Sequence, residues 1–279
     1  MSSHPDGKPE ISRRGFQTSL AAALAAPLVN ARESDWVSLF DGHSLKGWRE
    51  AENKGSWKVQ GGALCAAGPR SHLFYTGPVN GASFKNFELE AEVMTEPEAN
   101  SGIYFHTAYQ EKGWPQKGFE IQVNNTALGE GTYRERKKTG SLYGVRNVYK
   151  QFLRDNQWFT VRAEVRGKNV RIYLNGMMVV DYTEPTPVIF ASDSERDRRL
   201  DRGTFALQCH DPGSKARYRN IRVRPLPDDT PTPADAEIPV VDDDYRNILT
   251  LAAQNYPMVD FHVHLKNGPT LEEALRRSR

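Results

Sequence analysis

Polar side chains that could perform acid–base chemistry alternate with apolar residues in three short segments of this chain. The segments are residues 103–106, 119–123 and 204–210. Successive side chains of a strand point to opposite faces, so each segment can bury its apolar set and present its polar one. The side chains presented in this way are Tyr104, His106, Glu120, Gln122, Gln208 and His210.

If the three segments are neighbouring strands of one sheet, they pool a carboxylate, two imidazoles, two amides and a phenol. That set suits acid–base chemistry on hydroxyl-rich substrates. Exposed sheet faces are polar in any case, so a solvated surface is the competing interpretation. Trp48, Tyr104 and Trp114 are candidate stacking surfaces for sugar rings, with core packing as the alternative for the two tryptophans.

Short β-strands must position these residues. From Asp35 onward apolar residues recur near every second position, and Gly, Asn, Asp and Pro interrupt them at short intervals. The clearest strands are residues 56–59, 63–66, 87–94, 102–106, 119–123, 159–166, 170–174, 177–182, 204–210 and 218–225. Asn175-Gly176 predicts a two-residue hairpin. Many antiparallel strands without an amphipathic helix predict an all-β, concanavalin-like jelly-roll sandwich of two antiparallel sheets.

The sandwich is expected over residues 35–227, with one long loop. Residues 124–158 are polar and basic, which predicts an elaborated loop over one face. The charge run at 134–138 is interpreted as solvated surface rather than an anion site. Cys65 and Cys209 lie in strand-like runs and are expected to be separate buried thiols, with one disulfide bridge as the alternative.

The first 31 residues resemble a twin-arginine export signal. Arg13-Arg14 precedes an apolar run at 20–29 that is too short to span a membrane, and residues 29–31 fit a signal-peptidase site. A basic helical N-terminus is the alternative. We expect a mature protein that starts at Arg32, lies in the periplasm or outside the cell, and has no transmembrane segment.

Beyond the sandwich, the sequence predicts a Pro/Asp-rich linker at 228–242 and an incomplete second domain at 243–279. His262 and His264 lie two apart on a predicted strand and could hold one metal ion. The strand resembles the first strand of amidohydrolase-type barrels, but only 15 residues follow His264, whereas a barrel needs about 250 residues. We therefore expect a truncated metal motif; an unrelated tail is the alternative.

Composition excludes two classes of protein. The chain has 279 residues, a net charge of +2, 10% aromatic and 26% charged residues. These values are not those of a disordered chain or of a dedicated nucleic-acid binder.

Eight motifs occur in order along the predicted sandwich. They are residues 38–48, 57–64, 87–90, 100–103, 118–122, 139–144, 174–176 and 205–208. Together they resemble the 3-keto-disaccharide hydrolase family, also described as 3-keto-glucoside lyase/hydratase, over nearly all of residues 36–225. One departure concerns the last active strand, where the family pattern Gln-Asp-His-Gly is replaced by residues 208–213, with Asp211 after the histidine instead of before it.

The resemblance implies an enzyme that cleaves 3-keto-glycosides by removing the C2 proton, eliminating the C1 substituent and adding water. It implies Glu120 as the base and His210 as the acid or enolate donor. His106, Gln122, Tyr143, Gln208 and Tyr104 would orient the sugar, and Asp211 has no fixed role. A sugar oxidoreductase would supply the keto-sugar. A divalent metal cofactor stays open because no dense acidic loop commits to calcium, and a non-catalytic, lectin-like carbohydrate-binding module is the alternative function.

Overall fold

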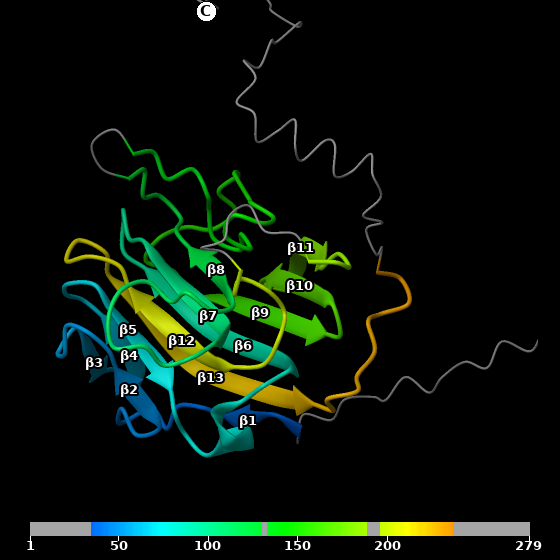
Figure 1. Ribbon diagram of the computed structural model, residues 1–279. Coiled ribbons are helices and arrows are strands. Elements are labelled where there is room, and N and C mark those ends of the chain that lie inside the picture. Colours follow the sequence, from blue (N-terminus) through cyan, green and yellow to red (C-terminus); the bar gives the residue numbers. More distant parts are fainter. Residues whose placement is uncertain (1–34, 130–132, 189–195, 237–279) are drawn as a thin grey trace, which may run out of the picture. The chain divides into compact units, whose positions relative to one another are not determined.

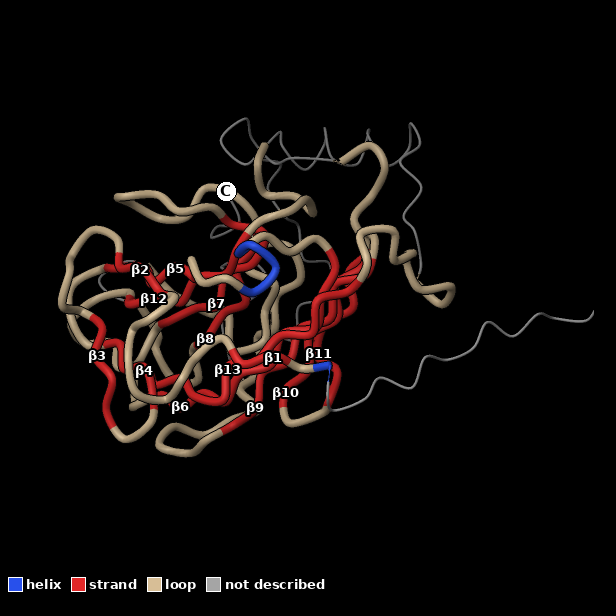
Figure 2. Tube along the Cα trace, turned by 90° about the horizontal axis from the view of Figure 1, so that it is seen from below, coloured by secondary structure: helices blue, strands red, loops and turns tan. Residues whose placement is uncertain are grey.

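The computed structural model describes residues 35–129, 133–188 and 196–236 (Figure 1). These residues form two antiparallel sheets, which confirms the predicted all-β sandwich. In Figure 2 the strands of the two sheets are seen as two layers joined by long loops. The expected export signal at 1–31 and the fragment at 243–279 with His262 and His264 lie outside the described residues. Among the described residues, no helix has the length and apolar character needed to cross a membrane.

The larger sheet has eight strands in the order β11-β10-β9-β6-β13-β4-β3, and β1 pairs with β13. Its strands are β1 (Val37–Ser38), β3 (Trp57–Gln60), β4 (Ala63–Ala66), β6 (Asn86–Thr95), β9 (Phe159–Arg166), β10 (Asn169–Leu174), β11 (Met177–Thr183) and β13 (Ala216–Leu226). The smaller sheet has the order β2-β5-β12-β7-β8. Its strands are β2 (Trp48–Glu50), β5 (Ser71–Tyr75), β7 (Ser101–Thr107), β8 (Phe119–Val123) and β12 (Thr204–Cys209). A 3-10 turn covers Val79–Ala82.

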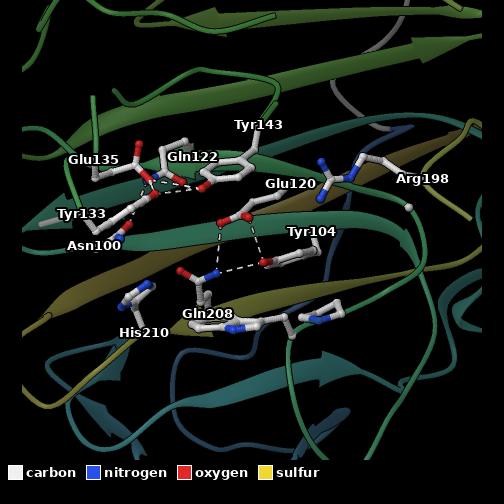
Figure 3. A pocket seen from close by; sticks show the side chains of 13 residues that line it. Asn100, Tyr104, Glu120, Gln122, Tyr133, Glu135, Tyr143, Arg198, Gln208 and His210 are labelled. Carbon is white, nitrogen blue, oxygen red and sulfur yellow. Dashed lines mark hydrogen bonds between the residues drawn. The ribbon is translucent and has the colours of Figure 1, made fainter. Parts of the chain in front are cut away.

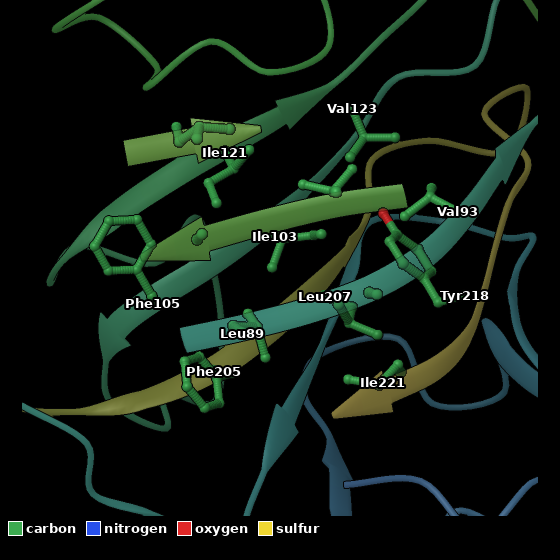
Figure 4. Close-up of a cluster of buried hydrophobic side chains, with 14 of the residues drawn as sticks. Leu89, Val93, Ile103, Phe105, Ile121, Val123, Phe205, Leu207, Tyr218 and Ile221 are labelled. Atoms are coloured by element: carbon green, nitrogen blue, oxygen red, sulfur yellow. The ribbon is translucent and has the colours of Figure 1, made fainter. Parts of the chain in front are cut away.

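The hydrophobic core lies where the inner faces of the sheets meet (Figure 4). Ile103, Phe205 and Leu207 come from the smaller sheet, and Leu89 and Val93 from the larger, all almost fully buried. Burying one such side chain contributes about 1.5–3 kcal/mol. The alternation expected for the three polar segments is therefore confirmed, because their apolar residues belong to this core.

Local turn chemistry and both cysteines also agree with the sequence. Asn175 and Gly176 have φ of 48° and 81° between β10 and β11, which matches a turn with positive φ at both central residues. Cys65 and Cys209 are separate, buried thiols.

The described part of the predicted linker contacts the sandwich. Lys168 donates its backbone N–H to the Thr232 hydroxyl at 2.9 Å, and the Asn86 amide donates to the Asp228 carbonyl at 3.1 Å. Arg171 forms an ion pair with Asp235 at 3.0 Å. Residues 228–236 thus follow the larger sheet rather than leaving it.

Candidate functional site

A pocket of about 490 Å³ lies on the outer face of the smaller sheet. Strands β7, β8 and β12 supply one part of its lining. Trp114 and Pro115 come from the loop before β8, and Tyr133, Glu135 and Tyr143 come from the long loop after it (Figure 3). The predicted outer face is therefore a pocket partly covered by loops rather than an open surface.

Strand register brings the predicted side chains together. In the β7–β8 pair Tyr104 lies opposite Glu120, and β12 pairs with the other edge of β7. This confirms that the three polar segments are neighbours in one sheet. Five of the six side chains predicted from the three segments line the pocket: Tyr104, Glu120, Gln122, Gln208 and His210. Tyr143, predicted from the family resemblance, lines it too.

His106 was expected on the same face, and that prediction is wrong. Its φ is 55°, so the backbone leaves the regular alternation at this residue. The ring is almost fully buried, packs against Phe87 and Phe105, and its Nε2 lies 2.8 Å from the Lys85 carbonyl. His106 therefore packs within the fold, and the pocket is lined without it.

Glu120 is at the centre of the hydrogen-bond network in the pocket. The Tyr104 hydroxyl donates to its Oε2 at 2.8 Å, and the Gln208 amide donates to its Oε1 at 3.0 Å and to the Tyr104 oxygen at 2.9 Å. Burial of the carboxyl raises its pKa from 4.5 to about 7, although both hydrogen bonds favour the charged form. At neutral pH this carboxyl is thus able both to accept and to return a proton.

Gly102 makes room for the Glu120 side chain. A Cβ atom at Gly102 would lie 2.3 Å from Glu120 Oε1, closer than any real contact. Gly102 is opposite Gln122 in the β7–β8 ladder, and the Gln122 amide donates to the Asn100 side chain at 2.8 Å. The missing side chain therefore lets the Glu120 carboxyl lie across β7 toward Tyr104 and Gln208.

His210 follows the last residue of β12 and is held by its neighbour. Its Nδ1 lies 2.7 Å from Asp211 Oδ2, while the same carboxylate accepts from Ser214 Oγ at 2.8 Å and from the Gly213 N–H at 2.8 Å. Burial opposes ionisation of Asp211, but these bonds outweigh it and lower its pKa. Asp211, displaced in sequence from the family position, therefore orients the imidazole.

The two candidate tryptophans have different environments. Trp114 lines the pocket, and its ring centroid lies 5.0 Å from that of His210. Trp48 does not line the pocket: it is buried against Tyr75 and donates its indole N–H to the Leu39 carbonyl at 2.8 Å. The suggestion that Trp48 stacks on a sugar is therefore wrong, because this ring packs in the core.

Glu135 is a second carboxylate in the pocket, and the sequence analysis missed it. It accepts hydrogen bonds from the Tyr133 hydroxyl at 2.5 Å, the Tyr143 hydroxyl at 3.2 Å and the Lys137 N–H at 2.8 Å. Burial opposes its ionisation, yet these bonds outweigh it and lower its pKa. The interpretation of residues 134–138 as solvated surface is wrong for Glu135 and Lys138, both of which are buried.

The pairing of the long loop with β8 explains how Tyr143 reaches the pocket. The Tyr143 N–H donates to the Glu120 carbonyl at 2.9 Å and the Gln122 N–H to the Ser141 carbonyl at 2.9 Å. Residues 141–143 thus run along the edge of β8. The local sequence pattern did not predict this pairing, because it joins residues that are about 20 positions apart in the chain.

Arg198 and Asn100 also line the pocket, and neither was predicted as a site residue. Arg198 lines the pocket in Figure 3, and its charge favours the ionised form of Glu120. Asn100 stands at the start of one of the eight motifs, which was an available signal, whereas nothing in the sequence pointed to Arg198. Across the described ranges no three His, Cys, Asp or Glu side chains group closely enough to hold a metal ion.

Comparison with known proteins identifies a family and a fold. The family model for the 3-keto-alpha-glucoside-1,2-lyase-like domain matches residues 35–224. Two crystal structures from Parabacteroides distasonis, both provisionally assigned as glycosyl hydrolases, are similar. One is 19% identical with a TM-score of 0.57, covering 71% of this chain and 98% of its own. The other is 21% identical with a TM-score of 0.53, covering 68% and 99%. No curated protein matches the chain.

Proposed function

Because this chain belongs to the 3-keto-alpha-glucoside-1,2-lyase-like domain family, we propose that it cleaves 3-keto-glycosides by elimination followed by hydration. The ketone at C3 makes the C2 hydrogen acidic. Glu120, as carboxylate, accepts this proton, and the C2–H electrons form the C2–C3 double bond of an enolate. Donors near C3 stabilise the negative oxygen as it develops.

Elimination then breaks the C1–O bond. The enolate electrons form a C1–C2 double bond and restore the C3 ketone, while the leaving oxygen takes a proton from His210 Nε2. The products are a 2-hydroxy-glucal with a 3-ketone and the free leaving group. Asp211 on Nδ1 keeps Nε2 as the nitrogen directed to the substrate and stabilises the charged ring.

Hydration completes the reaction and resets the enzyme. Water adds its hydroxyl to C1 and loses a proton to His210, while Glu120 returns its proton to C2. One water molecule is consumed, so the net reaction is hydrolysis. Because the C1–O bond breaks by elimination, no oxocarbenium ion is formed. The oxidised substrate would come from a sugar oxidoreductase acting earlier.

The position of Glu120 is the observation that supports this proposal most. A carboxyl with a pKa of about 7, held by Tyr104 and Gln208 in a pocket with an Asp-oriented histidine, matches the needs of proton transfer at carbon. A carbohydrate-binding module needs hydrogen-bonding groups and stacking surfaces but no such pair of groups.

The test compares oxidised and unoxidised glucosides as substrates. We expect wild-type protein to release the leaving group from 3-keto-glucosides and to leave ordinary glucosides intact. The same assay with and without a chelator tests whether a divalent metal is needed. Glu120→Gln keeps the shape and one acceptor oxygen but removes the base, so turnover should fall about 10²- to 10⁴-fold while binding persists. Binding of plain oligosaccharides with no conversion of 3-keto-glucosides would favour the lectin-like alternative.

A further inference from the structure

A second pocket of about 430 Å³ adjoins the one that holds Glu120. The two pockets share three lining residues, Asn100, Tyr133 and His210. Glu120, Tyr104 and Gln208 line only the first pocket. The second has its own lining beyond these three residues, which includes Glu98, Leu128 and Asp211.

The shared histidine fixes how a substrate can lie across the two pockets. Asp211 holds Nδ1 of His210, which leaves Nε2 for the substrate. Proton abstraction requires C2 of the oxidised ring beside Glu120, in the first pocket. The glycosidic oxygen is bonded to C1, so the group that protonates it must lie at the boundary between the oxidised ring and the leaving group. His210 lines both pockets, so it can lie at this boundary with the oxidised ring in the first pocket and the leaving group in the second.

We propose that the second pocket is the subsite for the leaving-group sugar, and that Leu128 and Glu98 determine how well that sugar is accepted. This inference rests on the proposed function. Leu128 is 64% exposed although it is apolar, and it offers a surface to the C–H face of a pyranose. Glu98 is exposed too, and its carboxylate can accept hydrogen bonds from sugar hydroxyls. An apolar surface with a few polar groups is the usual composition of a small-molecule site.

Backbone hydrogen bonds hold both residues in place. The Glu98 N–H donates to the Thr126 hydroxyl at 2.8 Å, and the Leu128 carbonyl accepts from the Glu135 N–H at 3.0 Å. These two hydrogen bonds use the backbone N–H of Glu98 and the backbone carbonyl of Leu128. The side chains of both residues are therefore available to a ligand. Changing either side chain should therefore leave the fold intact.

The experiment measures a preference, because a preference separates the subsite from the reaction itself. The kcat/KM is determined for a 3-keto-disaccharide and for methyl 3-keto-glucoside, whose leaving group is methanol, and the ratio of the two is compared among variants. Leu128→Ala and Glu98→Gln should each lower this ratio several-fold, mainly through KM for the disaccharide. Met178→Ala changes another exposed apolar residue, on β11, and as the matched control it should leave the ratio unchanged.

The outcomes distinguish the two proposals. If wild-type protein converts both substrates and the Leu128 and Glu98 variants keep the wild-type ratio, the subsite inference is wrong while the proposed function stands. If wild-type protein converts neither substrate, both are wrong. A lower ratio, with weaker product inhibition by glucose in Leu128→Ala, supports the leaving-group subsite.

Discussion

Two carboxyl groups line the same pocket with pKa shifts of opposite sign. Glu120 is raised to about 7 by burial, whereas the bonds from Tyr133 and Lys137 hold Glu135 below its ordinary value despite burial. Environments that separate the pKa values of two acids separate their roles. Glu135 is thus a fixed negative charge that holds Tyr133 and Tyr143, while Glu120 can exchange a proton near neutral pH.

The first prediction concerns the pH dependence of turnover. The base works as a carboxylate, so kcat/KM should have a limb that rises with pH, with its midpoint near pH 7. Tyr104→Phe removes a hydrogen bond to the charged form. A hydrogen bond to a charged group is worth about 1.5–3 kcal/mol, so the midpoint should move up by about one pH unit or more.

The control for this prediction is Tyr173→Phe, which removes a hydroxyl from β10 of the other sheet. It should leave the midpoint at the wild-type value. An unmoved midpoint in Tyr104→Phe would show that Glu120 does not set the rising limb of the profile.

A second prediction concerns stability. The pKa of Glu120 is higher in the folded protein than the ordinary value of 4.5, so the folded state binds this proton more tightly than the unfolded chain does. Stability is therefore lost as pH rises from about 4.5 to about 7, by at most about 3 kcal/mol, and by less because solvent reaches the pocket. Glu120→Gln should be more stable than wild type at pH 8 and equal to it at pH 4.

Denaturant unfolding at the two pH values measures this difference directly. Glu98→Gln changes an exposed carboxyl and should match wild type at both. A Glu120→Gln protein that is less stable than wild type at pH 8 would mean that the carboxylate is stabilised, not strained, in the fold.

At the scale of strands, period-two patterning carried most of the information. Residues 63–66, 119–123 and 159–166 form strands with the predicted bounds. In 159–166 buried and half-buried side chains alternate, as the pattern predicts. Strand Ser71–Tyr75 was missed: all five residues are buried, since its outer face lies under Trp114 and Tyr109.

The site was predictable where it follows strand parity and not where it depends on distant loops. Glu120, Gln208 and their neighbours follow from alternation, whereas His106 leaves it through one positive φ that no pattern reveals. Glu135 appeared as one acid in a basic run, and only the pairing of its loop with β8 brings it into the pocket. Sequence therefore specified the sheet surface, and tertiary contacts specified the loops over it.

The third prediction uses the contact between β7 and β8. Gly102→Ala would place a Cβ 2.3 Å from Glu120 Oε1, and the end of a flexible side chain can move away more easily than a strand can. We expect turnover to fall at least about tenfold, as general-base catalysis requires hydrogen-bond reach to the substrate, with little change in melting temperature.

A double variant shows whether the loss acts through Glu120. If it does, Gly102→Ala with Glu120→Gln should be no slower than Glu120→Gln alone, because residues in contact are not additive. Additive losses would mean that the alanine affects the site by another route.

At the scale of the whole molecule, the folded body extends beyond the end of its last strand. β13 stops at Leu226, and the predicted linker begins at 228. Yet Asn86 and Lys168 both hydrogen-bond to the segment that follows. The predicted linker therefore does not leave the sandwich at 228, and these contacts place the end of the folded body later in the chain.

The last prediction therefore compares two shortened chains, one ending at Ala236 and one at Leu226. The first keeps the Thr232 and Asp235 contacts and should melt within about 1 °C of the full chain. The second loses several hydrogen bonds, each worth about 1 kcal/mol. Since 1 kcal/mol shifts the melting temperature by about 2–4 °C in a domain of this size, a fall of several degrees is expected.

Thr232→Val in the longer form should reproduce part of that fall, whereas Asp235→Asn, at an exposed ion pair, should reproduce little. Equal melting temperatures for the two shortened chains would show that residues 227–236 do not stabilise the sandwich, and a large loss already at Ala236 would show that residues beyond it do.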